Sequence, residues 1–304
     1  CGDTKSVHEE IILNIRLPRL LSAIFCGIAL SVSGAVMQSI LRNPLGSPFT
    51  LGISNAAAFG AAFAVIMFGA GSMQSSVSDS VLVNNPYLLT ISAFIWSLFS
   101  AFIILLVAKI KGSSPENMIL TGIIIGSLFV SLTTGLQYMA DDVELAAIVF
   151  WTFGDLSRAS WSEFWILAGV VSVVFIYFMY NRWNYTALDT GDESAQSLGV
   201  NVKRIRNTGM IMASLATSVA VSFFGIIAFV GLIVPHIVRR LTGSDERFLL
   251  PAAGLFGGAF LLFSDILARS IISPLTLPVG VITSIIGSPI FIVLLLKGKG
   301  KSQW

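Results

Sequence analysis

The chain has 304 residues, of which 55% are hydrophobic and only 11% are charged. A soluble domain carries about 25% charged residues, whereas the mean hydropathy of this chain is +0.86. This composition excludes a soluble globular domain and indicates a membrane protein with several spans. The net charge of +2 is too small to suggest nucleic-acid binding, and no stretch interleaves basic with aromatic residues.

Nine apolar segments are predicted to cross the membrane as helices. The first follows the tetrad Arg16-Leu17-Pro18-Arg19 and ends at Leu41, which matches the roughly 20 residues needed to cross about 30 Å of hydrocarbon. The expected fold is therefore an all-α, polytopic integral membrane protein. The predicted spans are residues 17–41, 50–70, 87–108, 118–139, 162–181, two within 208–238, 249–268 and 279–296.

Proline and glycine mark the breaks between these segments. Pro44, Gly46 and Pro48 predict a turn after the first span, because proline cannot continue a helix and glycine relaxes the backbone. Gly225 and Gly231 offer breaks that divide residues 208–238 into two spans, of which the second is short. Residues 71–86 are expected to be loop.

Positive charge is divided unevenly between the two sides of the membrane. Of the 18 lysines and arginines, 13 fall in loops on the side of the C-terminus and five fall on the other side. Cytoplasmic loops carry the excess of Lys and Arg, so the C-terminus is predicted to lie in the cytoplasm and the protein in the cell membrane. Arg16, Arg19 and Arg269 then lie outside, where positive charge is disfavoured and a specific role is expected.

Two predicted spans carry faces of small residues. Gly122 and Gly126 form one in the fourth span, and Gly280 and Ser284 form another in the last span. Such faces allow helices to approach closely, although a pore-lining surface is the alternative. Helix packing is the favoured interpretation for Gly122 and Gly126.

No pattern in the chain predicts catalysis or a cofactor. The tail Gly300-Lys301-Ser302 resembles the end of a phosphate-binding loop, but Leu295 stands where that motif requires glycine. No group of His, Cys, Asp or Glu has metal-ligand spacing, and Cys1 and Cys26 are not expected to form a disulfide. The chain is therefore expected not to be an enzyme and to hold no metal or cofactor.

An ion-coupled carrier or a channel is the alternative from another class. Such proteins mark their pathways with ionisable residues inside the membrane, and the first four predicted spans contain none in their interiors. Asp265 is the clearest candidate elsewhere, but Arg269 lies four residues later on the same helix face. This spacing predicts a local ion pair rather than a proton or sodium relay.

The longest internal polar stretch covers residues 182–207. Within it, Gly191 to Val200 predicts a short cytoplasmic helix, capped by Asp192 and ended by Gly199. One interpretation is an ordinary amphipathic connector. The other is a docking helix for a cytoplasmic motor subunit.

Several short motifs follow one another in an order typical of a known family. The chain resembles, over its whole length, the FecCD permeases, which are subunits of ABC importers for iron-siderophores, haem and cobalamin. The motifs lie at residues 16–19, 33–38, 43–45, 51–54, 191–200, 229–236, 250–251, 264–269, 277–280 and 287–291.

The resemblance implies a set of partners. Two permease copies, or a permease and its paralogue, form the pore in the membrane lipid, and two cytoplasmic ATPases that bind ATP and magnesium dock on the loop matching residues 189–200. A substrate-binding protein docks outside, where arginines matching Arg16, Arg19 and Arg269 meet its glutamates in the cobalamin importer. The alternative is that these arginines extend to lipid headgroups. The implied ATPase-docking residues are Asp192, Glu193, Ser194, Ala195, Leu198, Gly199 and Val200.

The cargo expected from the resemblance is a ferric siderophore, followed by haem, cobalamin or an oxyanion such as molybdate. Residues 1–15 are expected to form an extracytoplasmic segment, 16–297 the transmembrane domain and 298–304 a cytoplasmic basic tail. The family has ten spans, so one span is expected to precede this chain. A lipidated mature terminus at Cys1 is the alternative.

Overall fold

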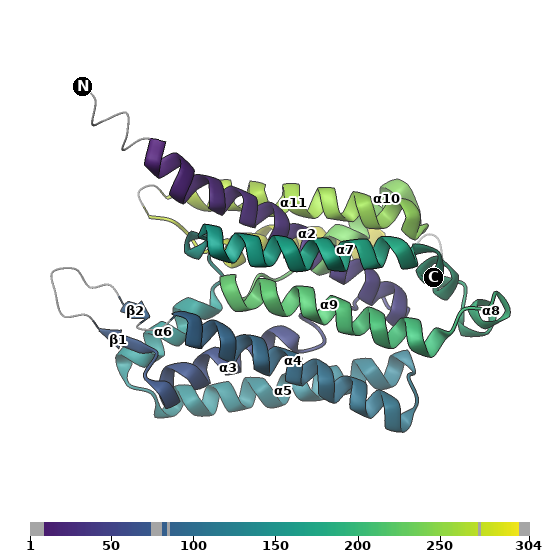
Figure 1. Ribbon diagram of the computed structural model, residues 1–304, viewed down its shortest axis with the longest axis horizontal. Coiled ribbons are helices and arrows are strands. Elements are labelled where there is room, and N and C mark those ends of the chain that lie inside the picture. Colours follow the sequence, from purple (N-terminus) through teal and green to yellow (C-terminus); the bar gives the residue numbers. More distant parts are fainter. Residues whose placement is uncertain (1–8, 74–80, 84–85, 273–274, 298–304) are drawn as a thin grey trace.

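The computed structural model describes residues 9–73, 81–83, 86–272 and 275–297, and nearly all of them belong to a bundle of helices (Figure 1). A two-stranded antiparallel hairpin, β1 (Gly71–Met73) and β2 (Val81–Val83), is the exception. The helices are η1 (Ile12–Arg16), α2 (Leu17–Leu41), α3 (Ile53–Phe68), α4 (Pro86–Lys111), α5 (Pro115–Met139), α6 (Asp142–Thr152), η2 (Leu156–Arg158), α7 (Trp161–Asp189), α8 (Asp192–Ser197), α9 (Val202–Phe224), α10 (Val230–Thr242), α11 (Glu246–Ser270) and α12 (Val279–Lys297).

Six of the described helices are long and apolar enough to cross a membrane. They are the continuous helix Glu9–Leu41, α4, α5, α7, α9 and α11. Two further apolar helices, α3 and α12, are shorter. The 13 residues of α10 rise only about 20 Å, too little for a bilayer core of about 30 Å. The all-α membrane fold is confirmed, whereas the count of nine full spans is not.

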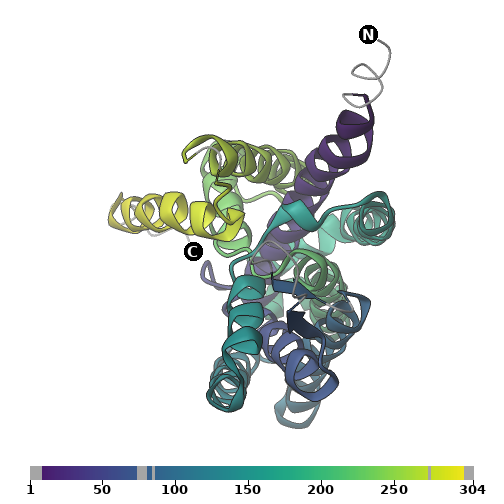
Figure 2. The same cartoon turned by 90° about the vertical axis from the view of Figure 1, so that its left-hand side faces the viewer.

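Helix α2 lies at the centre of the bundle and runs obliquely to α7 and α9 (Figures 1 and 2). It packs against α7, α9, α10 and α11. Glycines allow the closest of these approaches: a methyl group on Gly34 would overlap the carbonyl oxygen of Gly231, and one on Gly27 would overlap that of Gly257. Small residues are what membrane helices use to pack at such short range.

The segment between α9 and α10 is not helical. Gly225 ends α9 with φ of 75°, and Phe229 begins α10 with φ of 69°. The predicted break at Gly225 is confirmed, whereas Gly231 lies inside α10. A methyl group on Gly154 would overlap the carbonyl oxygen of Ile226, so the segment is covered by protein. Irregular backbone at membrane depth requires such cover, because lipid cannot satisfy its polar groups.

Two elements were missed by the sequence analysis. Helix α6 begins with a capping box, in which Asp141 accepts from the backbone N–H of Glu144 and the Glu144 carboxylate accepts from that of Asp141. Three apolar residues of α6, including Trp151, are buried. The hairpin lies in the stretch expected to be loop. It lies with the start of α2 at one end of the bundle, the hairpin end, while α8 lies at the other, the α8 end (Figure 1).

Candidate functional site

The arginines expected at the outer mouth differ in their surroundings. Arg16 is exposed in the last turn of η1. Arg19 is mostly buried, and its Nη2 and Nε lie 2.7 Å and 3.0 Å from Oδ1 of Asp265. Arg269 is about one third exposed, and its Nη2 lies 3.1 Å from Oδ2 of the same carboxylate. The structure therefore brings Arg19 and Arg269 together on one acid.

Asp265 does more than the expected pairing within its own helix. Its side chain is fully buried and lies between two guanidinium groups, one from α2 and one from α11. A buried carboxylate requires such pairing, because desolvation of an unpaired charge is costly. The interpretation as a local pair with Arg269 was thus incomplete, since it omitted Arg19, 246 positions earlier in the chain.

The predicted helix in the 182–207 loop is present as α8. Its N-cap is Gly191, without a side-chain hydrogen bond, so the expected cap at Asp192 is wrong. Asp192 is the first residue of the helix, and its Oδ1 accepts a 2.7 Å bond from Nη2 of Arg206. Gly199 follows the helix in a left-handed conformation, with φ of 84°.

The residues expected to meet an ATPase separate into buried and exposed sets. Ala195 is fully buried in the main hydrophobic core, and Val200 is half-buried against the same core. Leu198, by contrast, exposes 70% of its surface. Asp192 is intermediate, and the exposed set is the one most open to direct contact with a partner. It consists of Glu193, Ser194, Leu198 and Gly199.

A polar cavity of about 650 Å³ opens beside α8. It lies between the end of α2, the start of α5 and the start of α8. Its charged lining is Arg42, Glu116, Asp192 and Glu193. This surface is suited to polar contacts with another protein.

Arg206 is a buried, multiply bonded residue of this region that the sequence analysis did not single out. Its side chain exposes only 2% of its surface, although it lies at the start of α9 next to the polar loop. It donates to the carbonyl oxygens of Ile40 and Ser113, at 2.8 Å and 2.5 Å, and to Asp192. In the sequence it was one of 13 basic residues on its side, and no local pattern distinguishes it.

A second polar cluster lies at the same end. Asp189 of α7 accepts a 2.7 Å bond from Oγ of Ser39 of α2. Glu246 of α11 is fully buried and lies 3.4 Å from Nη2 of Arg239 of α10. Polar side chains thus join α2 to α7 and α10 to α11 at this end of the bundle.

The small-residue faces lie against neighbouring segments of the same chain. A methyl group on Gly126 would lie 3.1 Å from Cα of Gly52, and one on Gly122 would lie 3.0 Å from Cα of Leu51. A methyl group on Gly280 would meet the carbonyl oxygen of Ile226 at 2.6 Å. The Ser284 hydroxyl donates to the Gly280 carbonyl at 2.8 Å.

The opposite face of α5 carries exposed hydroxyl groups. Ser127, Ser131 and Thr134 are all exposed. Each hydroxyl donates to the carbonyl four residues earlier in the helix, at 2.9 to 3.0 Å. We call these three residues the α5 hydroxyl stripe.

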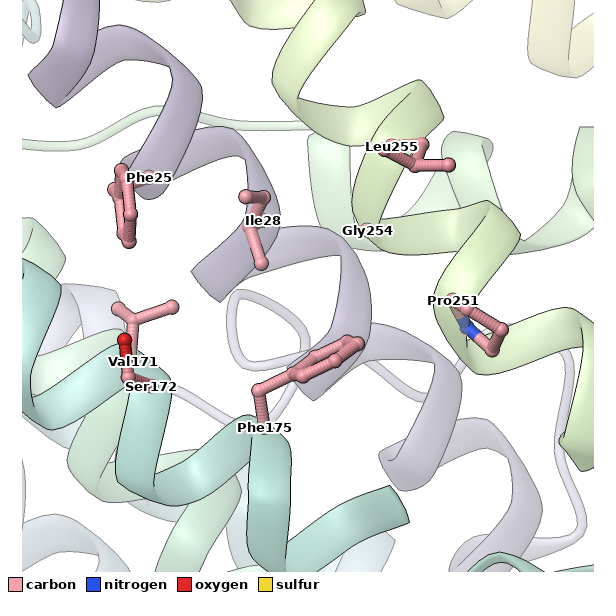
Figure 3. A pocket seen from close by; sticks show the side chains of 8 residues that line it. All are labelled: Phe25, Ile28, Val171, Ser172, Phe175, Pro251, Gly254 and Leu255. Carbon is pink, nitrogen blue, oxygen red and sulfur yellow. The ribbon is translucent and has the colours of Figure 1, made fainter.

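An apolar groove of about 360 Å³ lies between α2, α7 and α11. Figure 3 shows its lining from the three helices, with Ser172 as the one hydroxyl among them. None of the predicted site residues lines it. The lining is Phe25, Ile28, Val171, Ser172, Phe175, Pro251, Gly254 and Leu255.

The described part of the chain contains no group of three or more His, Cys, Asp or Glu side chains placed to hold a metal. Cys26 is a buried free thiol, and Cys1 lies outside the described residues.

Known proteins are similar to this chain along nearly its whole length. A Methanocaldococcus jannaschii protein named as an ABC transporter permease is 56% identical over 97% of this chain and 84% of its own length. The hemin transport system permease protein HmuU of Yersinia pestis is 36% identical over 97% of this chain and 85% of its own. Other similar proteins are named for vitamin B12 import and Fe(3+)-citrate import.

A solved structure described as a metal-chelate type ABC transporter in an inward-facing conformation superposes with a TM-score of 0.86. It is 30% identical to this chain, with coverage of 96% of this chain and 89% of that one. The model of the FecCD transport family matches residues 1–297. With that match and relatives of this similarity, the chain belongs to the FecCD transport family.

Proposed function

We propose that this chain is the permease subunit of a binding-protein-dependent ABC importer that moves an iron chelate, haem or a related metal chelate into the cell. The observation that carries the proposal is the family match over residues 1–297. Relatives named for hemin, Fe(3+)-citrate and vitamin B12 transport support a bulky chelate as the cargo class. A ferric siderophore is the expected member of that class.

The ATPase is proposed to be a separate cytoplasmic subunit that docks on α8. Support comes from Leu198, an apolar side chain that exposes 70% of its surface directly after α8 and is free to contact a partner. The polar cavity beside α8 extends this surface to the start of α5. The exposed residues Glu193, Ser194 and Gly199 complete the proposed ATPase contact.

An external binding protein is proposed to dock at the hairpin end. Arg16 is exposed, and Arg269 is partly exposed even though it pairs with Asp265. Arg19 and Arg269 share the single Asp265 carboxylate, which leaves one positive charge there, and exposed Arg16 adds a second that can attract acidic side chains. Arg19 is proposed to act mainly by fixing α2 to α11 beneath this surface.

The translocation path is proposed to run between two permease copies along the α5 hydroxyl stripe. Gly122 and Gly126 are engaged with residues 51 and 52 of their own chain, which leaves the opposite face of α5 for the path. Ser131→Cys should react with a membrane-impermeant maleimide in the assembled importer, whereas Leu132→Cys, also exposed in the single chain, should react more slowly. Equal rates for the two cysteines would contradict this assignment.

The experiment that tests the transport function is uptake into proteoliposomes. The permease is reconstituted with its genomic-neighbour ATPase and binding protein, and ⁵⁵Fe-labelled siderophore and haem are offered outside. Uptake is expected to require ATP in the lumen and to disappear when the ATPase subunit is left out. Full uptake without any ATPase would establish a secondary transporter or channel instead.

The proposed docking surface is tested with Arg16→Glu, since Arg16 is exposed and its replacement leaves the buried ion pairs intact. Binding-protein affinity is expected to fall and the remaining binding to weaken further with salt, because exposed charges are screened. An affinity equal to wild type at low salt would assign Arg16 to the lipid headgroups.

A further inference from the structure

Both flanks of α8 are tied to the same turn of α2. On one flank, Asp189 accepts a hydrogen bond from Oγ of Ser39. On the other flank, Arg206 of α9 donates from Nη2 to Asp192, the first residue of α8, and from Nε to the carbonyl oxygen of Ile40. Ser39 and Ile40 are neighbours in the last turn of α2. The short helix α8 therefore cannot shift without acting on this turn.

Arg206 binds three acceptors from different parts of the chain. The Ile40 carbonyl has no partner within α2, because the residue four positions later is Pro44, which has no N–H group. Arg206 supplies the missing donor. A guanidinium is planar and rigid, so bonds to several acceptors fix their relative positions in a way that lysine cannot reproduce. Its third acceptor is Ser113, between α4 and α5.

Helix α2 connects this end of the molecule with the rest of the bundle. In its middle, Gly34 lies in backbone contact with Gly231 of α10. Near its start, Arg19 is bonded to Asp265 of α11 at the hairpin end. The 25 residues of α2 extend about 37 Å. Any displacement of its last turn is carried to α10 and toward the hairpin end, because close-packed interiors transmit strain.

We infer that Arg206 and Ser39 are positioning residues that make α8 and the last turn of α2 move as one body, so that motion of a docked ATPase is transmitted along α2. The inference rests on the proposed function, since it takes the ATPase to dock on α8. Neither side chain contacts cargo or nucleotide in this scheme. Their task is to convert a movement of α8 into a movement of α2.

The test compares coupling with docking in the complete reconstituted importer. In Arg206→Lys combined with Ser39→Ala, one contact is weakened and the other removed. ATPase affinity and ATP hydrolysis are expected to persist, while the amount of cargo moved per ATP hydrolysed falls severalfold. Lys203→Gln is the matched control, since Lys203 is an exposed cation in the first turn of α9, and its ratio should equal that of wild type.

The outcomes separate the inference from the proposed function. A double variant that is folded, binds ATPase and moves as much cargo per ATP as wild type overturns the inference alone. A wild-type permease that binds no ATPase overturns both. If Arg206→Lys does not fold, Ser39→Ala alone decides: a reduced ratio with unchanged ATPase affinity supports the inference, and an unchanged ratio overturns it. Loss of ATPase binding in Ser39→Ala would also overturn it, since docking rather than transmission would then depend on Ser39.

Discussion

The two ends of the bundle place charge in opposite ways. At the hairpin end the acid, Asp265, is fully buried and its partners Arg19 and Arg269 retain some exposure. At the α8 end the cation, Arg206, is buried and its partner Asp192 exposes 36% of its side chain. Both clusters hold an end of α2, but one presents positive charge outward and the other presents an acid. The same helix is therefore anchored at both ends by ion pairs in which the buried and the more exposed partner have exchanged sign.

The largest expected effect comes from breaking the element that joins the two clusters. Gly34→Val adds a branched side chain where even a methyl group would overlap the Gly231 carbonyl. Folded permease is expected to be lost, since backbone on both sides prevents relief. The yield of monodisperse protein in detergent measures this. Gly135→Val is the control, because nothing lies within 4 Å of a methyl group at that position in α5; equal losses in both variants would contradict the close packing of α2 and α10.

Charge reversal should distinguish buried from exposed arginines at the hairpin end. Arg19→Glu would place a second carboxylate beside buried Asp265, and breaking such a pair costs about 3–5 kcal/mol. Arg16→Glu should change stability by no more than about 0.5 kcal/mol because it lies on the surface. Denaturation in mild detergent compares them. Equal stabilities of the two variants would show that burial of Asp265 does not require its ion pair with Arg19.

At the α8 end, substitutions should distinguish a buried from an exposed apolar residue. Ala195→Glu buries an unpaired charge in the core and should destabilise the fold. Leu198→Glu should leave stability unchanged and lower ATPase affinity by about tenfold, as loss of a contact worth more than 1 kcal/mol does. Thermal unfolding measures the stability, and pull-down titration measures the ATPase affinity. Normal ATPase affinity in a stable Leu198→Glu protein would remove Leu198 from the contact.

The smallest effect is expected at an exposed ion pair. Nε of Arg247 donates to both Oδ atoms of Asp245, at 2.9 Å and 2.7 Å, and these bonds hold the pKa of Asp245 below its usual range. Because the pKa of Asp245 is lower in the folded state, the ion pair stabilises the fold at pH values above the unfolded-state pKa of about 3.9. This stabilisation is lost as the pH falls through the folded-state pKa. Asp245→Asn should therefore lower stability slightly at pH 7, and the difference from wild type should vanish in acid. A difference that grew in acid would contradict this assignment.

The sequence by itself determined the class of fold, the family and the rough position of the apolar helices other than α6. Long apolar runs have few alternatives to a membrane helix, because every backbone polar group must be satisfied internally. The break at Gly225 and the short helix before Gly199 were also predictable, since glycine supports the backbone conformations found there. The α6 helix was missed because its start resembled a polar loop, although Asp141 and Glu144 form a capping box at the expected spacing.

Only the tertiary structure decided which of the predicted site residues face outward. Ala195 and Leu198 are both apolar and three residues apart, yet one is buried and the other exposed. Residues at this spacing share one side of a continuing helix, but α8 ends at Ser197 and Leu198 is its C-cap. Arg19 and Asp265 are 246 positions apart in the chain. Arg206 and Ile40, whose carbonyl oxygen accepts its hydrogen bond, are 166 positions apart. Local patterns carry no signal for such pairs, since they arise from the packing of α2 against α9 and α11 rather than from neighbours in the chain.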